Sequence, residues 1–592
     1  MSTTTAAASR TSNGRSGLWN RQLTTYPNTA PRMVYLAITV IATVTLYYEL
    51  YVGSSVSTLF LQKLHMGFGF YVVAIAFGNL IGAFGSLFAG LSDRMGRTNL
   101  VVIGLAITGI MTFAVIPAST NRWEFIIFTW VVGLVEGICL VATPALIRDF
   151  SPQTGRGTAM GFWTAGPVLG SLIVAVVASN TLAAHPAVSA WTHQYRICGI
   201  VGIIVAIIAW LGLKELSPGL RDQLMVSMHD RALVEAKAKG IDVEASLRNP
   251  WRQLFKPDVV VSAFGISVFL LVYYTAVGFA VIYLTTVFPF SLQQANGLGN
   301  WNWGFNVIAV ILFGFISDRF RVRKPFMLAG GIASAVLLVL YLARAGHPTS
   351  YYHVAILLAV LSFCMGIAYV PWMASFTETV EARNPALTAT GLAIWGWTVR
   401  FVVFASYLVI PHLINTVNPL VNYGTGVSTA AAQYSTQIAD AQRLAPELAV
   451  IQAHPALFTQ LSAHPTPALI SQAEQVAGPK VFASIAANQK AIQGVIAAAS
   501  APGNEALYGK NAQGKPQNGF NYVVQHGPAV EKAAKDTPGQ WKDWYWVCFG
   551  GMVFFLGTVP FMKGRWSPKK AKADEEAHEA MVQAEMAKLH LS

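Results

Sequence analysis

The sequence predicts an all-α membrane protein in which twelve transmembrane helices form two pseudo-symmetric bundles of six, with a helical insert outside the membrane between helices 11 and 12. Of the 592 residues, 54% are hydrophobic and only 11% are charged, whereas about a quarter of the residues of a soluble domain are charged. The apolar residues fall into blocks of roughly 20, the length of a helix that crosses the hydrocarbon of a bilayer. A short charged motif also occurs twice, at equivalent positions of the two halves.

Each apolar block is expected to be a helix, because backbone N–H and C=O groups inside lipid must be hydrogen-bonded within their own segment. The predicted spans are residues 33–55, 69–91, 99–117, 123–146, 158–179, 195–214, 259–286, 296–316, 325–343, 353–375, 388–411 and 543–562. They divide the chain into a tail at 1–30, a six-helix bundle at 31–214, a linker at 215–257, helices 7 to 11 at 258–411, an insert at 412–540, helix 12 at 541–562 and a second tail at 563–592.

The net charge of +13 is explained by where the basic residues lie. If both termini are cytoplasmic, 27 of the 40 lysines and arginines fall in the tails and inner loops, and four fall in or beside the short outer loops. The outer segment before helix 12, residues 412–542, holds eight more, but long segments cross the membrane largely regardless of charge. This asymmetry predicts a multi-pass protein of the cytoplasmic (inner) membrane with both termini inside, and it argues against a nucleic-acid partner.

The N-terminal tail, residues 1–30, is rich in Ser, Thr, Ala and Asn and has no apolar core followed by a small-residue cleavage site. We therefore expect a disordered cytoplasmic tail rather than a cleaved signal peptide. The four cysteines fall inside predicted spans, where buried structural thiols are expected and a disulfide framework is not.

The insert, residues 412–540, is rich in Ala and Gln. Residues 430–444 and 468–476 have helical spacing, and prolines separate such stretches, which predicts several short helices forming a small cap outside the membrane. After Gly503 the pattern weakens to that of a loop. The C-terminal tail, residues 563–592, is expected to end in a charged cytoplasmic helix.

The repeated motif follows the second and the eighth predicted spans. The first copy reads Gly-Leu-Ser-Asp-Arg-Met-Gly-Arg at residues 90–97, and the second contains Asp318 and Arg319 within residues 314–324. An internal repeat of this kind suggests two similar bundles, the architecture that transporters use for alternating access. The aspartate of each copy can accept hydrogen bonds from a helix N-terminus or an arginine, and such a network would hold the bundles together in one state.

These residues resemble the major facilitator superfamily, whose members carry a similar motif between helices 2 and 3. The sequence departs from that motif at Ala89, where the family usually has the first glycine, because Gly90 follows one place later. A second match is the Arg-Gly pair at 156–157, and a third is the Ala-Gly-Pro-Val-Leu-Gly stretch at 165–170, which resembles the helix-5 motif of many antiporters. The resemblance implies a gating role for Asp93, Arg94, Gly96, Arg97, Arg156, Gly166, Pro167, Gly170, Asp318 and Arg319.

Three ionisable residues, Glu49, Glu136 and Arg400, lie well inside predicted spans. A charged side chain at the bilayer centre costs about 2.5–3.5 kcal/mol on insertion scales, so such groups need a reason. In the family fold, helices 1 and 4 line the central cavity together with helices 7 and 10, which makes Glu49 and Glu136 candidate proton carriers. The alternatives are a structural ion pair with Arg400 and an acid that stays protonated.

The surroundings of Glu136 resemble one branch of the superfamily more closely. The stretch Gly-Leu-Val-Glu-Gly at 133–137 is similar to helix 4 of the anion:cation symporters, where the glutamate is linked to proton coupling. That branch normally has an arginine where this chain has Thr129, and a second arginine where it has Leu50. The two losses put an organic-anion substrate in doubt, unless Arg400 supplies the anion contact from another helix.

Aromatic and amide residues complete a predicted solute pocket, because apolar pockets with a few polar groups suit small organic ligands. Tyr273 and Tyr274 are the strongest candidates, since they lie at mid-span. An aromatic belt at the membrane interfaces explains such residues equally well elsewhere. The full set of predicted solute contacts is Tyr47, Tyr48, Tyr51, Tyr273, Tyr274, Asn302, Asn306, Trp395 and Arg400.

The sequence thus predicts a secondary active transporter that moves a small organic solute by alternating access, coupled to protons, as an uptake symporter or as an exporter. No Gly-x-x-x-x-Gly-Lys-Ser/Thr loop or clustered histidine set is present, so no enzymatic activity, cofactor or metal is expected. The expected partners are the solute, protons and the lipid bilayer, and the expected state is a monomer. The remaining alternatives are a multidrug or metabolite exporter and a transporter-like receptor that acts through the external insert.

Overall fold

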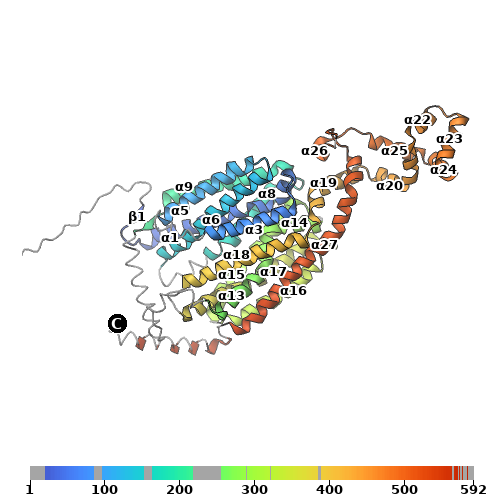
Figure 1. Ribbon diagram of the computed structural model, residues 1–592. Coiled ribbons are helices and arrows are strands. Elements are labelled where there is room, and N and C mark those ends of the chain that lie inside the picture. The colour runs from blue at the N-terminus through green and yellow to red at the C-terminus, as the bar shows by residue number, and fades with distance from the viewer. Residues whose placement is uncertain are drawn as a thin grey trace, which may run out of the picture. The chain divides into compact units, whose positions relative to one another are not determined.

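The computed structural model is built almost entirely of helices (Figure 1). It describes residues 21–85, 96–151, 163–217, 220, 255–288, 290–320, 322–383, 388–511, 513–562 and parts of 566–584. The first half contains α1 (Thr29–Ser55), α2 (Ser57–Lys63), α3 (Phe68–Gly85), α5 (Arg97–Ile110), α6 (Arg122–Phe150), α8 (Gly166–Thr181) and α9 (Trp191–Gly212). The second half contains α13 (Pro257–Phe269), α14 (Leu271–Val287), α15 (Leu292–Phe320), α16 (Lys324–Leu342), α17 (Tyr351–Arg383), α18 (Thr388–Leu413) and α27 (Gly519–Thr558).

Eleven helical segments of the described chain are long and apolar enough to cross a membrane, judged by length and composition. One of them is the consecutive pair α13 and α14, with Leu270 between them. Helix α8 is apolar but has only 16 residues, and residues 152–162 before it lie outside the described part. The multi-pass helical fold is therefore confirmed, and the twelve-helix, two-bundle layout stays a prediction.

The helices carry apolar side chains on their outer faces as well as their inner faces. Along α9, Ile200, Ile204, Ile207 and Leu211 follow one another at helical spacing and are 46% to 66% exposed. A soluble protein would rarely expose so continuous an apolar row. Exposure to lipid explains it, because lipid tails are as apolar as the side chains themselves.

Small residues let the helices approach closely. A Cβ atom at Gly137 of α6 would lie within 3.1 Å of the backbone of Gly82 of α3, and a Cβ atom at Gly109 of α5 would lie 3.0 Å from the backbone nitrogen of Ile203 of α9. Without a hydrophobic driving force between helices in lipid, such close backbone contact is a principal source of helix association. Any larger residue at these two positions would separate the helices.

A short parallel strand pair ties the start of the chain to the end of α9. Strand β1 (Gln22–Leu23) pairs with β2 (Glu215–Leu216), and Leu23 and Tyr26 pack against the core of the first half. The prediction of a disordered tail is therefore wrong for residues 21–30, because two apolar side chains and a backbone pairing order them. Residues 1–20, and almost all of the linker at 215–257, lie outside the described part.

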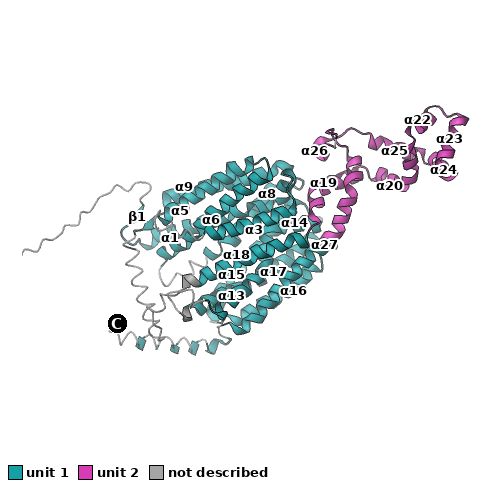
Figure 2. Cartoon of the chain, in the orientation of Figure 1, with its two compact units in different colours: residues 1–414, 539–592 teal, residues 415–538 magenta. Residues whose placement is uncertain are grey.

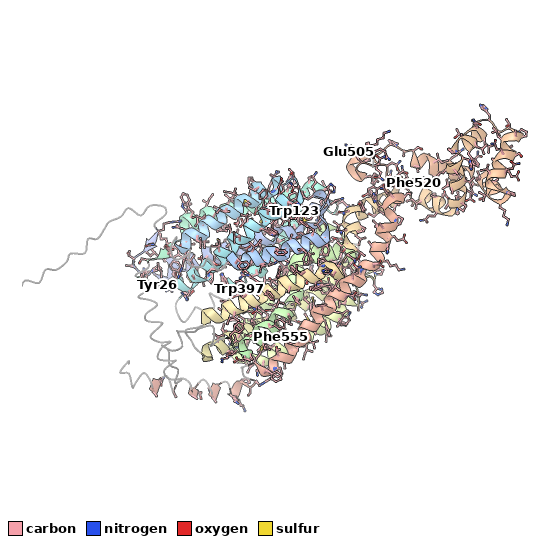
Figure 3. The ribbon with its side chains drawn as sticks, in the orientation of Figure 1. Tyr26, Trp123, Trp397, Glu505, Phe520 and Phe555 are labelled. Atoms are coloured by element: carbon pink, nitrogen blue, oxygen red, sulfur yellow. The ribbon has the colours of Figure 1, made fainter. Side chains whose placement is uncertain are left out.

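The chain divides into two compact units, residues 1–414 with 539–592, and residues 415–538 (Figure 2). The second unit covers most of the predicted insert and consists of α19 (Val417–Gln433), α20 (Ser435–Arg443), α21 (Ala445–Ala453), α22 (Pro455–Ala463), α23 (Pro467–Ala477), α24 (Pro479–Ala487), α25 (Gln489–Ala499), α26 (Glu505–Tyr508) and the start of α27. Phe520, labelled in Figure 3, packs with Val495 and Ala498 in one of its small cores.

The predicted loop after Gly503 is wrong in its second part, because α27 begins at Gly519 rather than at the predicted 543. Proline normally interrupts a helix, since it lacks the backbone N–H and clashes with the preceding turn. Helix α27 nevertheless continues through Pro528 and Pro538. These prolines masked the helix in the sequence.

Candidate functional site

The predicted tyrosines of α1 and α14 lie together inside the first unit. Tyr47 and Tyr51 stand one turn apart on α1 with ring centroids 5.6 Å apart, and Tyr273 and Tyr274 on α14 have ring centroids 5.2 Å apart. Electrostatic interactions link Tyr47 to Tyr274 and Tyr51 to Tyr273. Helices from both halves of the chain therefore contribute to one aromatic cluster.

Two adjoining pockets lie next to this cluster. The first has about 490 Å³ of space not filled by atoms and is lined by α1, α8, α14, α15 and α17. The second has about 520 Å³ and is lined by α14, α15, α16, α17 and α27. Tyr51 lines the first, Tyr273 and Asn306 line the second, and Asn302 and Trp303 line both. No lining residue of either pocket is charged, so both suit an uncharged or aromatic part of a solute.

The polar atoms of these pockets are only partly satisfied. Asn306 Nδ2 donates to the Ser362 carbonyl oxygen at 2.9 Å. The Tyr273 hydroxyl is buried and has no hydrogen-bond partner among the described residues. An unsatisfied buried hydroxyl costs about 1–3 kcal/mol, so a hydrogen-bonding solute or a water molecule at this position would stabilise the site.

Glu136 and Arg400 flank the aromatic cluster without forming an ion pair. Glu136 of α6 is 2% exposed, and one of its carboxylate oxygens is buried without a partner in the described chain. Arg400 of α18 is half-buried and interacts electrostatically with Glu136 and with Tyr47 and Tyr274. Within the described residues no salt bridge joins the two charged groups, so the structural ion pair considered from the sequence is not formed here.

Glu49 faces away from the pockets. Its carboxylate accepts a hydrogen bond from Thr108 Oγ1 of α5 at 2.6 Å, and its other oxygen faces Gly202 of α9, where a Cβ atom would overlap it. Glu49 is 4% exposed and interacts electrostatically with Glu136. It is therefore held between α1, α5 and α9, one layer behind the aromatic cluster.

Five of the nine predicted solute contacts line neither pocket: Tyr47, Tyr48, Tyr274, Trp395 and Arg400. Tyr48 is 1% exposed and interacts with Cys198 and Glu49 rather than with Tyr47. Trp395 of α18 packs against Trp372, with ring centroids 5.7 Å apart. Neither lines a pocket. Adjacent residues on a helix point about 100° apart, and here Tyr48 neighbours Cys198 of α9 whereas Tyr47 neighbours Tyr274 of α14.

The sequence reasoning missed residues of the site. Tyr369 of α17 interacts electrostatically with Tyr47 and Tyr274, and Ser171 lines the first pocket. Tyr369 carried a usable signal, because it lies in the middle of predicted helix 10, one of the four helices expected to line the cavity. Ser171 carried none, since a serine inside a helix is unremarkable.

The helix-5 motif packs directly behind the aromatic cluster. Gly166 and Pro167 begin α8, and a Cβ atom at Gly166 would lie 3.0 Å from Thr43 Cγ2. A Cβ atom at Gly170 would lie 2.6 Å from Tyr47 Cβ. The motif therefore lets α8 approach α1 at the position of Tyr47, whatever further role it has.

The first copy of the repeated motif is described only from Gly96 onward; Asp93, Arg94 and Arg156 lie outside the described residues. Gly96 has φ +87°, and a Cβ atom there would lie 2.7 Å from Glu215 Oε1. Arg97 Nη1 forms an ion pair with Asp149 Oδ2 of α6 at 2.6 Å. The glycine thus permits both the turn and the approach of Glu215, and the arginine joins the start of α5 to the end of α6.

The second copy forms a similar local network. Arg323 Nη1 pairs with Asp318 Oδ1 at 2.8 Å, and Arg323 Nη2 pairs with Glu378 Oε1 of α17 at 3.0 Å. Arg319 lies in the last turn of α15. The pairing joins the end of α15 to the end of α17, as Arg97 and Asp149 join α5 to α6.

The chain is similar in sequence to known membrane transporters. A sequence model of the Major Facilitator Superfamily matches residues 33–406. The efflux pump radE of Floropilus chiversii is 25% identical over 255 residues, which cover 42% of this chain and 45% of that protein. Sialin of Homo sapiens is 22% identical over 290 residues, which cover 47% of this chain and 56% of that protein. The matches therefore span about half the length of these relatives.

One solved structure matches the fold over most of the chain. It is a bacterial homolog of the human lysosomal transporter Spinster, in an inward-facing and unoccupied conformation. The TM-score is 0.52 at 15% sequence identity, and the match covers 87% of this chain and 99% of that chain. At this level of identity the likeness concerns the fold alone.

Proposed function

The chain belongs to the Major Facilitator Superfamily, and from that premise we propose that it is a proton-coupled carrier of a small organic solute. The single observation that carries the proposal is the grouping of Tyr51, Tyr273, Asn302 and Trp303 around two adjoining pockets, the first of which is lined by helices of both halves. A solute bound in the first pocket would contact both halves at once. Movement of one half against the other would then expose it to each side in turn.

The charged groups beside the pockets receive different roles in this proposal. Arg400, which has no acidic partner in an ion pair within the described chain, binds an anionic group of the solute together with the hydroxyls of Tyr47 and Tyr274. Glu136, closed off from solvent and close enough to sense Arg400, binds and releases the coupled proton. Protonation of Glu136 changes the charge balance around Arg400, which couples proton binding to solute binding.

Glu49 fits an auxiliary role in proton coupling. Its hydrogen bond from Thr108 and its interaction with Glu136 support a second proton site rather than a solute contact. The Arg97–Asp149 and Arg323–Asp318 pairs each lie within one half, so they brace the helix ends of that half. The proposal keeps both copies of the repeated motif as elements that govern the movement of the halves, in a protein of the cytoplasmic membrane with both termini inside.

Export is the second candidate function. It is favoured by the resemblance of residues 165–170 to the helix-5 motif of many antiporters and by the similarity to a protein named as an efflux pump. The two directions differ in a measurable way. In everted vesicles an exporter accumulates its solute when the lumen is acidified, whereas an uptake symporter accumulates it in right-side-out vesicles under an inward proton gradient.

A two-step experiment tests the proposal. Purified protein is first screened for thermal stabilisation against a metabolite library, because a ligand that binds only the folded state raises the melting temperature by mass action. Each stabilising compound is then followed into proteoliposomes with and without a proton gradient. Gradient-dependent accumulation of any of these compounds supports the proposal. Stabilising compounds that never cross the membrane would contradict it and favour the receptor alternative.

A further inference from the structure

Three amide side chains on one face of α15 hold this helix to α1 and α8. Gln293 Nε2 donates to the Ser179 carbonyl oxygen at 3.2 Å, Asn296 Nδ2 donates to the Ser55 carbonyl oxygen at 2.9 Å, and Asn300 Nδ2 donates to Ser179 Oγ at 3.0 Å. Positions three and four residues apart share one face of a helix. We call Gln293, Asn296 and Asn300 the amide row.

The amide row lies at one end of the first pocket. Asn296 lines that pocket, as does Gly299 beside Asn300. Ser55 is the last residue of α1, and Ser179 lies in the last turn of α8. A Cβ atom at Gly299 would lie 2.9 Å from the Cβ atom of Ala175, so α15 and α8 are in close contact here. The amide row therefore joins α15 to the C-terminal ends of α1 and α8, beside the first pocket.

Amide contacts of this kind are suited to repeated opening. A neutral hydrogen bond adds only a modest net free energy, because water replaces it when the groups separate. Loss of one such bond changes an open-to-closed population ratio by about 2- to 10-fold. Three bonds together thus hold the pocket closed firmly, and each can be regained after the helices have parted. Asn300 also keeps a buried amide oxygen without a partner in the described chain, which opening would expose to water.

We propose that the amide row is a latch: it closes the solute pocket at the end where α1 and α8 terminate, and it releases when the pocket opens to that side. The proposal rests on the proposed function, in which this end faces the cell exterior. It assigns gating to Gln293, Asn296 and Asn300 and to their acceptors on Ser55 and Ser179, in addition to the two copies of the repeated charged motif.

Cysteine labelling tests the latch without any solute. Ala276 lines both pockets, and the four native cysteines are buried, so Ala276→Cys supplies a single reporter. Intact cells are treated with the membrane-impermeant thiol reagent MTSET. Adding Asn296→Ala with Asn300→Ala to the reporter is expected to raise the labelling rate about 10-fold or more, because the open state becomes more populated. Labelling in inverted vesicles is expected to stay the same or to slow.

A double-mutant cycle and a matched control sharpen the test. Within the row, Ser179→Ala removes only the acceptor of Asn300; it also removes the bond that this hydroxyl donates to the Val176 carbonyl oxygen within α8. Ser179→Ala and Asn300→Ala should therefore accelerate labelling to a similar degree, and the pair should do no more than either alone. Ser179→Ala also serves if the double asparagine variant fails to fold. Gln294→Ala is the control, because the exposed Gln294 side chain accepts from Ser291 N at the start of α15 and takes no part in the row.

Two results would overturn the latch: unchanged labelling in folded variants, and an equal increase from both faces, which would indicate general loosening. The labelling assay does not depend on transport. If labelling responds as expected but no compound is transported, the latch stands and the proposed function fails. If transport proceeds while labelling never responds, the proposed function stands and the latch fails.

Discussion

Glu136, Glu49 and Arg400 show how position within a helix decides the chemistry of a charged residue. All three lie at membrane depth, where a charge requires compensation. Thr108 donates a hydrogen bond to one oxygen of Glu49, and Glu49 and Glu136 each keep one buried oxygen without a partner in the described chain. Arg400 is half-buried near tyrosines rather than paired with an acid. In the proposed function, the partner of this cation arrives with the solute.

Replacement of this cation should weaken solute binding. We expect Arg400→Gln to lower the affinity for an anionic solute about 10- to 100-fold, because a charge-assisted hydrogen bond contributes about 1.5–3 kcal/mol. Thermal-shift titration of the wild type and the variant with each stabilising compound measures the change. Arg196→Gln, which removes an exposed arginine of α9, is the control. Equal affinities in wild type and Arg400→Gln would remove Arg400 from the site.

The sequence identified candidate residues for the site, but it did not predict the direction in which their side chains point. Tyr47, Tyr51, Tyr273 and Tyr274 were predicted and do lie together, because mid-span aromatic residues are conspicuous. The orientation of Glu49 was not predictable, since α1 is apolar on nearly every face and its periodicity gives no inner side. Tyr369 and Trp372, whose rings stack on each other, belong to α17, which is likewise apolar on all faces.

At the scale of elements, α8 and α1 form the support of the site. Gly166 and Gly170 let α8 lie against Thr43 and Tyr47, and this contact fixes the position of the Tyr47 ring. The first half of this arrangement, a glycine- and proline-containing helix 5, was predicted from its motif. Its packing partner was not, because close approach depends on what the neighbouring helix presents.

Enlarging Gly170 should therefore cost stability. We expect Gly170→Val to destabilise the protein by about 1–3 kcal/mol, the usual cost of overpacking, because even one added Cβ atom would lie 2.6 Å from Tyr47 Cβ. The measurement is the melting temperature of purified protein in detergent. Gly304→Ala on α15 is the matched control, since a Cβ atom there meets nothing within 4 Å. An unchanged melting temperature for Gly170→Val would show that α8 is not packed as described.

Elements differ in how well the sequence foretells them. The long apolar helices were predicted because length and composition alone specify them. The ordered segment at 21–30 and the early start of α27 were not, for opposite reasons. The order at 21–30 depends on a two-residue pairing with β2, which gives no local sequence pattern. The early start of α27 was not predicted because this helix contains Pro528 and Pro538, and prolines usually indicate a helix end.

At the scale of the whole molecule, the site belongs to one unit. All residues that line the pockets, together with Glu136 and Arg400, lie within residues 1–414 or 539–592. The second unit, residues 415–538, has small cores of its own, such as the one formed by Ala430, Tyr508 and Tyr522. The sequence predicts several short helices for this segment, but no motif in the sequence indicates what the second unit does.

Removal of this second unit separates a carrier from a receptor. We expect deletion of residues 425–535, bridged by a short Gly/Ser linker, to leave the rate of solute transport within about twofold of the wild-type rate, because the pockets and charged residues remain. Uptake into proteoliposomes measures it, and monodisperse elution confirms folding. A folded deletion variant that still binds its compounds but no longer transports them would show that the second unit takes part in the cycle.

In the proposed function Glu136 carries the coupled proton beside a solute pocket, and the Glu136→Gln variant tests this role. Glutamine keeps the shape of a protonated carboxyl group but cannot release a proton. In proteoliposomes with an imposed proton gradient, the variant should lose accumulation above equilibrium and keep solute exchange, while Glu124→Gln at the exposed start of the same helix should behave as wild type. Undiminished gradient-driven accumulation by folded Glu136→Gln protein would contradict the account.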